Sequence, residues 1–192
     1  MIAYTDHRRL QKELRQQKNA GKKIGFVPTM GSLHEGHLSL MRIAKQNSDY
    51  LVVSIYVNPL QFGQHEDLSA YPSDPEGDEA KCRSVGVNAV FRPQSLYTSN
   101  HATHVTVEGL SDGLCGASRP GHFKGVTTVV ARLFGMVQPD VAVFGEKDFQ
   151  QLAVIKRMVA DLAMPTVVLG GPLIRDLDGV ALSSRNAYLN SD

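Results

Sequence analysis

The amino-acid sequence predicts an α/β domain built on a doubly wound parallel sheet. Short β-branched or apolar runs alternate along the chain with longer segments of helical periodicity. The run LVVSIYV at 51–57 offers apolar side chains to both faces, as a central strand covered by helices on both sides would. Strands alternating with helices of this length are typical of βαβ units, and 192 residues suffice for one such domain with a proper core.

In the first half of the chain, local signals set the bounds of each element. Thr5 or Asp6 can cap a largely exposed helix that stops at Gly21. Pro75 suits the first turn of a later helix, and the acidic residues beside it favour a helix start. We expect these elements in order: helix 6–19, strand 23–27, helix 38–46, strand 51–57, helix 74–86 and strand 89–91.

The second half is less regular at first and then resumes the alternation. Residues 110–125 are rich in glycine and polar side chains, whereas 126–137 has helical spacing with apolar residues on most faces and ends before Pro139. No repeat, low-complexity tract or interdomain linker interrupts the pattern, so one domain is expected over 1–176. The predicted elements are strand 104–107, helix 126–137, strand 141–144, helix 147–162 and strand 166–169.

Composition and charge exclude several classes of protein. The chain is 42% hydrophobic and 20% charged, as in ordinary globular proteins, and its net charge of +1 argues against a nucleic-acid surface. No apolar stretch reaches membrane-spanning length, and the N-terminus lacks the apolar core of a signal peptide, so we expect a cytoplasmic protein without membrane contact. Cys82 and Cys115 are too few and too distant for a disulfide framework and are expected to be reduced.

The segment PTMGSLHEGH at 28–37 is the most informative motif, because it joins a predicted strand to a predicted helix. Gly31 and Gly36 allow a tight turn and close approach to a ligand, and the amides of a helix start suit a phosphate. His34 and His37, three residues apart, project from one face of a helical turn. Two imidazoles beside exposed amides could bind a polyphosphate and stabilise the charge that builds up during nucleotidyl transfer. The spacing is not that of zinc proteases, and neither the dinucleotide fingerprint nor a Walker A motif occurs here.

Each part of this motif also has an ordinary explanation. Strand–loop–helix junctions with two glycines are common, and either histidine alone could be a surface residue near a helix start. Further polar segments at other predicted strand ends favour the functional reading, since ligands of open parallel sheets gather at the carboxyl ends of the strands.

One such segment is 145–151, GEKDFQQ, directly after the strand that ends at Phe144. Lys147 offers a point charge for phosphate, Asp148 can accept a hydrogen bond from a ribose hydroxyl, and Gln151 can both donate and accept. When this segment is considered alone, its side chains are explained at least as well as the solvent-exposed first turn of a helix.

Three loops complete the candidate set. Residues 182–186, LSSRN, carry two hydroxyls and a guanidinium that could close over a triphosphate. Gln61 follows the second strand and could hydrogen-bond a carboxylate or hydroxyl of a substrate, or simply cap a turn. The basic loop 118–123 with Arg119 and His122 could be a phosphate neighbour, a subunit contact or plain surface.

Taken together, the segments PTMGSLHEGH, VNPLQF, RPGHFKGV, FGEKDFQQL and LSSRN, in this order, resemble the pantothenate synthetase (pantoate–β-alanine ligase) family. The resemblance runs from about Ile24 to the end of the chain. In it, residues 34–37 are the family's version of the HIGH signature, and 182–185 match the mobile KMSKS-like loop. The implied fold is a Rossmann-like doubly wound parallel sheet of the HIGH-motif nucleotidylyltransferase type. Family members carry a smaller C-terminal domain, so 177–192 are expected to hold the KMSKS-like loop and the start of that domain, which is otherwise absent.

The resemblance implies a two-step reaction. ATP and pantoate form pantoyl adenylate and pyrophosphate, and β-alanine then attacks the adenylate to give pantothenate and AMP. His37, the family's proton donor, His34 and Lys147 would be catalytic, and Gln61 and Gln151 would orient pantoate, with Gln61 also near β-alanine. The residues that would bind ATP are Met30, Gly31, Ser32, Leu33, His34, Glu35, Gly36, His37, Gly145, Glu146, Lys147, Asp148, Ile174, Leu182, Ser183, Ser184 and Arg185.

The resemblance also implies Mg²⁺ with ATP and a homodimer formed through this domain, while the sequence offers no carboxylate cluster for a dedicated metal site. A chain without the second domain is expected to be partly or wholly inactive. Two alternatives stay open at this point. Another HIGH-type nucleotidylyltransferase would explain the histidines but not the paired glutamines, and a non-catalytic nucleotide-binding module would bind ATP without pantoate-dependent chemistry.

Overall fold

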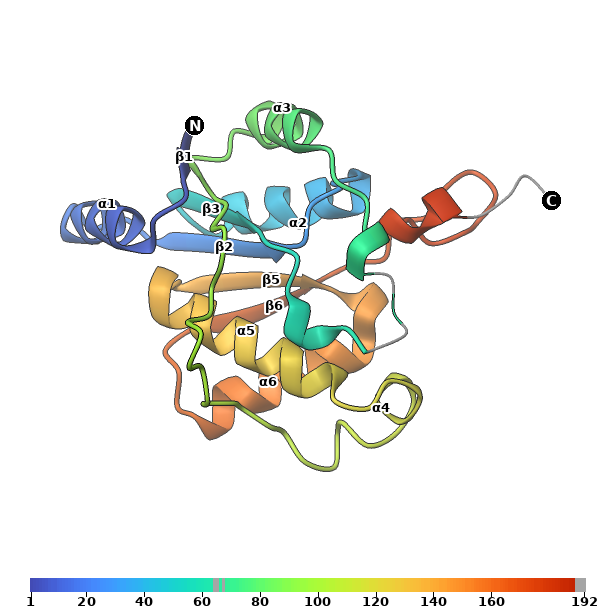
Figure 1. Ribbon diagram of the computed structural model, residues 1–192. Helices are drawn as coiled ribbons and strands as arrows, with labels where there is room; N and C mark the ends of the chain where they lie inside the picture. Colours follow the sequence, from blue (N-terminus) through green and yellow to red (C-terminus); the bar gives the residue numbers. More distant parts are fainter. Residues whose placement is uncertain (64–65, 67, 189–192) are drawn as a thin grey trace.

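The computed structural model describes residues 1–63, 66 and 68–188. Its centre is one parallel sheet in which the strands follow the order β1-β4-β3-β2-β5-β6 (Figure 1). The register is continuous between the two central pairs, with Ile24 beside Tyr50 and Gly25 beside Val141. The strands are β1 (Ile2–Tyr4), β2 (Ile24–Thr29), β3 (Tyr50–Ile55), β4 (Ala89–Phe91), β5 (Val141–Gly145) and β6 (Val167–Gly171).

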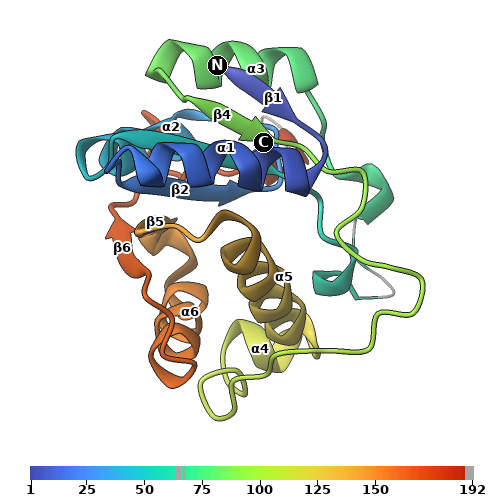
Figure 2. The same ribbon diagram turned by 90° about the vertical axis from the view of Figure 1, so that its left-hand side faces the viewer.

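Helices cover both faces of the sheet (Figures 1 and 2). Helices α2 (Glu35–Gln46) and α3 (Pro75–Val85) pack on one face. Helices α1 (His7–Asn19), α5 (His122–Val137) and α6 (Phe149–Asp161) pack on the other. The remaining elements are short: α4 (Cys115–Ser118) and the 3-10 turns η1 (Pro59–Gln61), η2 (Leu68–Ala70), η3 (Glu146–Asp148) and η4 (Ser184–Tyr188).

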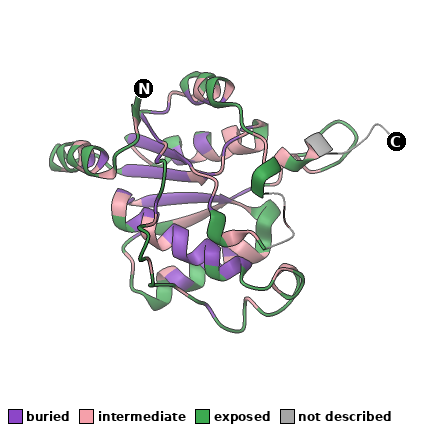
Figure 3. Cartoon of the chain, viewed as in Figure 1, coloured by how far each residue is buried: buried purple, intermediate pink, exposed green. Residues whose placement is uncertain are grey.

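The core consists of two layers because successive side chains of a strand point to opposite faces. In β2, Phe26 packs with α1, α5 and α6, whereas its neighbour Val27 packs with α2. Val52 and Val53 of β3 divide in the same way. Strands β2, β3, β4 and β5 and much of α5 are buried, whereas β1, most of β6 and the outer faces of α1, α3 and α6 are partly or fully exposed (Figure 3). The prediction of a doubly wound parallel sheet is therefore confirmed.

Several element bounds differ from the prediction for identifiable reasons. Helix α1 begins after Asp6, whose carboxylate accepts a hydrogen bond from the amide of Arg9 at 2.9 Å, as predicted. Helix α2 begins at Glu35, three residues early, and α5 begins at His122, four residues early. The edge strand β1 was not predicted, because three residues carry too little periodicity to stand out from the chain.

The predicted strand 104–107 is wrong. Its alternation of polar and apolar residues resembles a strand, but no ladder forms along it. Instead the amide of Val105 donates to Oγ1 of Thr128 at 3.1 Å, and the Val105 carbonyl accepts from Oγ1 of Thr127 at 2.6 Å. Two threonines of α5 therefore satisfy the backbone groups that a neighbouring strand would have satisfied.

The strand order reverses direction between β2 and β5. From β2 the chain proceeds through β3 to β4 on one side, and it then crosses to β5 and β6 on the other. The carboxyl ends of β2 and β5 consequently form the topological switch point at which open α/β sheets bind their ligands. Among the described residues, no helix combines the length and apolar character that crossing a membrane requires.

Candidate active site

A cavity of about 230 Å³ lies at this switch point. Its walls come from the loops that follow β2, β3, β5 and β6, from the start of α2 and from one face of α5. The sequence-predicted residues that line it are Met30, His34, Gly36, His37, Gln61, Gly145, Lys147, Asp148, Gln151, Ile174, Leu182, Ser183, Ser184 and Arg185. The predicted residues outside this lining are Gly31, Ser32, Leu33, Glu35 and Glu146. Segments far apart in the sequence therefore meet in one place.

The loop between β2 and α2 is held in a left-handed turn. Gly31 has φ +90° and Ser32 has φ +50°, both in the region that favours glycine. A Cβ at Gly31 would stand 3.0 Å from Oδ2 of Asp78 and 3.1 Å from Ile55, so the position requires both the conformational freedom and the small size of glycine.

Asp78 of α3 is the reason why this loop has a defined shape. Its carboxylate is buried and accepts hydrogen bonds from the amides of Ser32 at 3.0 Å and Leu33 at 2.7 Å. These two amides, which precede the helix start, are therefore not free for a phosphate. The amides of Glu35 and Gly36, in the first turn of α2, have no helical carbonyl one turn earlier to bond to. Sequence reasoning missed Asp78, because no local motif distinguishes it from other helical acids.

Replacing Asp78 with alanine should destabilise the protein by about 3 kcal/mol, since the buried amide of Leu33 and the partly buried amide of Ser32 would lose a charged acceptor. The free energy of unfolding from urea denaturation measures this loss. Glu76→Ala is the matched control: this acid is exposed on the same helix, and its removal should change stability by about 0.5 kcal/mol or less. Equal effects of the two substitutions would contradict the role given to Asp78.

The two histidines of the motif pack against each other, with ring centroids 4.1 Å apart. The amide of His34 donates to Nδ1 of His37 at 3.3 Å, so neutral His37 carries its proton on Nε2. Nδ1 of His34 is buried and has no hydrogen-bond partner in the described part of the chain. A Cβ at Gly36 would stand 2.9 Å from the His34 ring, which explains the glycine between the two histidines.

Burial and nearby positive charge keep both rings neutral. Burial, with smaller contributions from His34, Lys147 and Lys81, lowers the pKa of His37 to about 3. The same factors, burial first and then Lys147 and Lys81, lower the pKa of His34. Lys147 lines the same cavity as both histidines, and its positive charge contributes to the lowering of both pKa values.

Lys147 lies in η3, directly beyond the carboxyl end of β5. Its Nζ is 3.3 Å from Oδ1 of Asp148, and both side chains are partly exposed to the cavity mouth. Gln151, half-buried in the first turn of α6, also lines the cavity. Glu146 points instead toward Gly170, where a Cβ would meet its Oε1 at 2.9 Å.

The segment 174–185 folds back onto the histidine loop. The amide of Leu182 donates to the Ile174 carbonyl at 3.0 Å, and Arg175 and Ala181 form an antiparallel bridge. Oγ of Ser184 then donates to the carbonyl of Ser32 at 3.0 Å. The Arg185 guanidinium lies 6.0 Å above the ring of Tyr71. The Ser-Ser-Arg segment thus borders the cavity. Of the stretch 177–192, predicted to hold the KMSKS-like loop and the start of a further domain, residues 189–192 lie outside the described residues.

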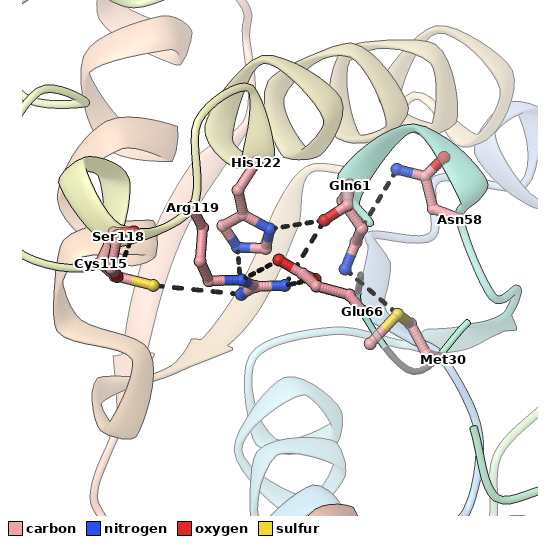
Figure 4. Close-up of polar contacts among 8 residues, drawn as sticks. All are labelled: Met30, Asn58, Gln61, Glu66, Cys115, Ser118, Arg119 and His122. Atoms are coloured by element: carbon pink, nitrogen blue, oxygen red, sulfur yellow. Dashed lines mark hydrogen bonds and ion pairs between the residues drawn. The ribbon is translucent and has the colours of Figure 1, made fainter. Parts of the chain in front are cut away.

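Gln61, at the end of η1, has its side chain fixed at both ends (Figure 4). Its Oε1 accepts from Nδ2 of Asn58 at 3.1 Å, and its Nε2 donates to Sδ of Met30 at 3.1 Å. Asn58 is itself buried: its Nδ2 also donates to the Gly125 carbonyl at 3.1 Å, and its Oδ1 accepts from the Tyr97 hydroxyl at 2.8 Å. Asn58 lines the cavity and was not assigned from sequence, although it lies in the same VNPLQF segment.

The role of Arg119 and His122 was left open by the sequence, and both line the cavity. Arg119 makes a two-pronged ion pair with Glu66, with Nε–Oε1 at 2.8 Å and Nη2–Oε2 at 2.5 Å. His122 is buried between Arg119 and the carbonyl of Gln61 (Figure 4). Glu35, by contrast, lies on the surface in an ion pair with Arg42.

An apolar wall faces these polar groups. It is formed by one side of α5 and was predicted only as a buried helix, without a side facing a ligand. Its residues are Val126, Val129, Val130 and Leu133. A cavity with one apolar wall and a few convergent polar groups is the usual form of a small-molecule site.

A doubly wound parallel sheet whose switch point gathers a HIGH-like histidine pair, a lysine and a Ser-Ser-Arg segment defines a domain of the HIGH-motif nucleotidylyltransferase type. Residues 3–192 match the family model described as Pantoate-beta-alanine ligase. The chain therefore belongs to the pantoate–β-alanine ligase family.

Individual relatives agree with this assignment. The pantothenate synthetase of Syntrophotalea carbinolica is 56% identical over 185 residues, which cover 95% of this chain and 65% of that protein. The chain thus spans slightly less than two thirds of the length of this relative. The crystal structure of pantothenate synthetase from Thermus thermophilus superposes with a TM-score of 0.95 at 49% identity, covering 100% of this chain and 68% of that one. A Francisella tularensis pantoate-beta-alanine ligase, described as complexed with Beta-gamma ATP and Beta-alanine, gives a TM-score of 0.94 at 38% identity, covering 100% of this chain and 74% of that one.

Proposed function

We propose that this domain performs the ATP-dependent condensation of pantoate with β-alanine through a pantoyl-adenylate intermediate, with release of pyrophosphate and AMP. The observation that carries the proposal is the convergence of His34, His37 and Lys147 on one cavity that also contains Gln61 and Gln151. Hydrogen-bond donors for a polyphosphate, from the lysine and the histidines, thus line the same cavity as two side-chain amides that can hydrogen-bond a small hydroxy acid.

The first step brings a carboxylate against the α-phosphate of ATP, so two anions must approach each other. Catalysis then depends on positioning and on positive charge rather than on a protein nucleophile. Lys147 and Arg185 supply fixed charge, and the neutral histidines supply N–H donors. A polyphosphate beside the rings would raise the pKa of His37 from its low value, because opposite charge favours the protonated form. His37 is therefore suited to donate a proton or hydrogen bond to the leaving phosphates.

The nucleotide would lie between the histidine loop and the two later segments. We assign its binding to the residues from Met30 to His37, to those from Gly145 to Asp148, to Ile174 and to 182–185. Within the first stretch, Gly31, Ser32 and Leu33 would shape the loop rather than contact the phosphates, because two of their amides are bonded to Asp78.

The amides of Gln61 and Gln151 would orient pantoate against the apolar wall of α5. An amide offers both a donor and an acceptor, which matches a substrate with hydroxyls and a carboxylate. The bonds from Asn58 to Gln61 and from Gln61 to Met30 fix the direction of that amide before substrate arrives.

Mg²⁺ would enter with ATP and neutralise charge on its phosphates. The described residues contain no group of three or more His, Cys, Asp or Glu side chains that could hold a metal, and Asp148 is the acidic residue in the cavity lining. We expect the ion to be bound chiefly by phosphates and water, as Mg²⁺ commonly is in nucleotide sites. The homodimer and the cytoplasmic location stay predictions.

The test is pyrophosphate exchange. The purified protein should incorporate labelled pyrophosphate into ATP only when pantoate is present, because the adenylate forms reversibly from ATP and pantoate. Pantothenate should then accumulate on addition of β-alanine. ATP binding by calorimetry without pantoate-dependent exchange would refute the proposal and leave a nucleotide-binding module. Exchange that requires a mononucleotide in place of pantoate would indicate a different transferase.

A further inference from the structure

The side chain of His122 has both ring nitrogens engaged within the protein. Nδ1 lies 2.8 Å from the carbonyl oxygen of Gln61, and Nε2 lies 3.1 Å from Nη1 of Arg119 (Figure 4). His122 is the first residue of α5, and Gln61 is the last residue of η1. The imidazole therefore joins the start of the apolar wall to the turn that carries a candidate substrate-binding amide.

The partners determine the tautomer of this ring. A guanidinium can only donate hydrogen bonds, so Nε2 must accept from Arg119. A carbonyl oxygen can only accept, so Nδ1 must carry the proton and donate to Gln61. Both contacts are satisfied at once by the neutral Nδ1–H form and by no other form of the ring. Burial also lowers the pKa of His122, which agrees with a neutral ring.

Arg119 is in turn oriented by Glu66. The planar fork of the guanidinium pairs with both carboxylate oxygens, and the two side chains are only 23% and 24% exposed. The contacts thus run from Glu66 to Arg119, from Arg119 to His122, and from His122 to the backbone carbonyl of Gln61. Nη2 of Arg119 also donates to this carbonyl, at the longer distance of 3.5 Å, so the His122 contact at 2.8 Å is the shorter of the two. The side chain of Gln61 is held separately by Asn58 and Met30.

We propose that His122 is a positioning residue, which donates from Nδ1 to the Gln61 carbonyl and so holds the backbone from which the Gln61 side chain reaches the hydroxy-acid substrate. This inference rests on the proposed function for the identity of that substrate. The geometry itself does not depend on the substrate, so the two can be tested apart.

Two substitutions separate the contacts of the ring. His122→Asn places an amide nitrogen near the position of Nδ1 and keeps the donor to Gln61, but it loses the acceptor for Arg119. His122→Gln reaches the position of Nε2 and keeps an acceptor for Arg119, but it loses the donor to Gln61. The KM for pantoate should rise roughly tenfold in His122→Gln, as expected for the loss of one buried hydrogen bond. In His122→Asn, which keeps that bond, the KM should rise by roughly twofold or less. The KM for ATP should change little in either variant.

Equal rises in the KM for pantoate in both variants, or parallel rises for ATP and pantoate, would overturn the proposal and indicate a merely structural histidine. Nitrogen-15 NMR of the unsubstituted protein provides a measurement without any substrate. The proposal requires a protonated Nδ1 and an unprotonated Nε2 at His122, and the opposite tautomer would overturn it. The side-chain amide resonance of Gln61 should shift in His122→Gln more than in His122→Asn. Absence of pantoate-dependent exchange in the unsubstituted protein would instead contradict the proposed function alone.

Discussion

Lys147→Ala should reduce pantoate-dependent pyrophosphate exchange by about 10²- to 10³-fold, the usual effect of removing one group that stabilises charge in a transition state. Lys147 follows β5 directly, lines the cavity and contributes positive charge at both His34 and His37. The protein should remain folded, because Lys147 is partly exposed and its ion pair with Asp148 belongs to a class worth about 1 kcal/mol or less. Exchange kinetics and urea unfolding on the same preparation measure the two effects.

Lys156→Ala is the matched control for charge, since Lys156 is exposed on α6 and does not line the cavity. It should exchange pyrophosphate at the rate of the unsubstituted protein. Lys147→Arg tests geometry, because it keeps the charge on a broader, planar head group. Full exchange activity in Lys147→Ala would contradict the assignment of this lysine to the phosphates. It would also contradict the proposal that Lys147 and the two histidines act together on one bound nucleotide.

The parts of the site that the sequence revealed are those encoded by local signals. Glycines that permit a turn, two histidines at helical spacing and a lysine after an apolar strand can each be read from a short local segment. The parallel alternation then brings the strand ends together without further information. For this reason the sequence predicts that His34, His37, Lys147, Gln61 and Gln151 belong to one site, and all five line the cavity.

The parts that the sequence did not reveal depend on contacts between distant segments. Asp78 is important because two amides 45 and 46 positions away point at its carboxylate, and nothing in the composition of α3 signals this. His122 is likewise defined by a carbonyl 61 positions away. The false strand at 104–107 has the same cause, because the threonines that replace a partner strand lie on a later helix. Sequence periodicity therefore predicts functional side chains that directly follow a strand. It does not predict side chains whose role is to hold a distant loop in place.

Gly125 is the position at which packing and the proposed chemistry are most closely coupled. It is buried in the first turn of α5, where η1 crosses the helix. A Cβ at this position would stand 2.1 Å from the Leu60 carbonyl oxygen and 2.6 Å from the amide nitrogen of Gln61. Both are backbone atoms, so no side-chain rotation can relieve the overlap. The carbonyl of Gly125 also accepts a hydrogen bond from Asn58, which ties the helix to the segment beside η1.

Gly125→Ala should therefore destabilise the protein by about 3 kcal/mol, the upper part of the usual range for overpacking. In a chain of 192 residues this corresponds to a fall in Tm of roughly 6 to 12 °C by calorimetry. Gly135→Ala in the same helix is the control, because Gly135 is exposed and a Cβ there meets nothing within 4 Å. Alanine has the higher helix propensity, so this variant should be about 0.5 to 1 kcal/mol more stable. Because Gly125→Ala forces η1 away from the helix, it should also weaken pantoate binding more than ATP binding. If both variants unfolded at the same temperature, η1 would not pack as closely on α5 as the structure requires, and the fixed position of Gln61 would lose its support.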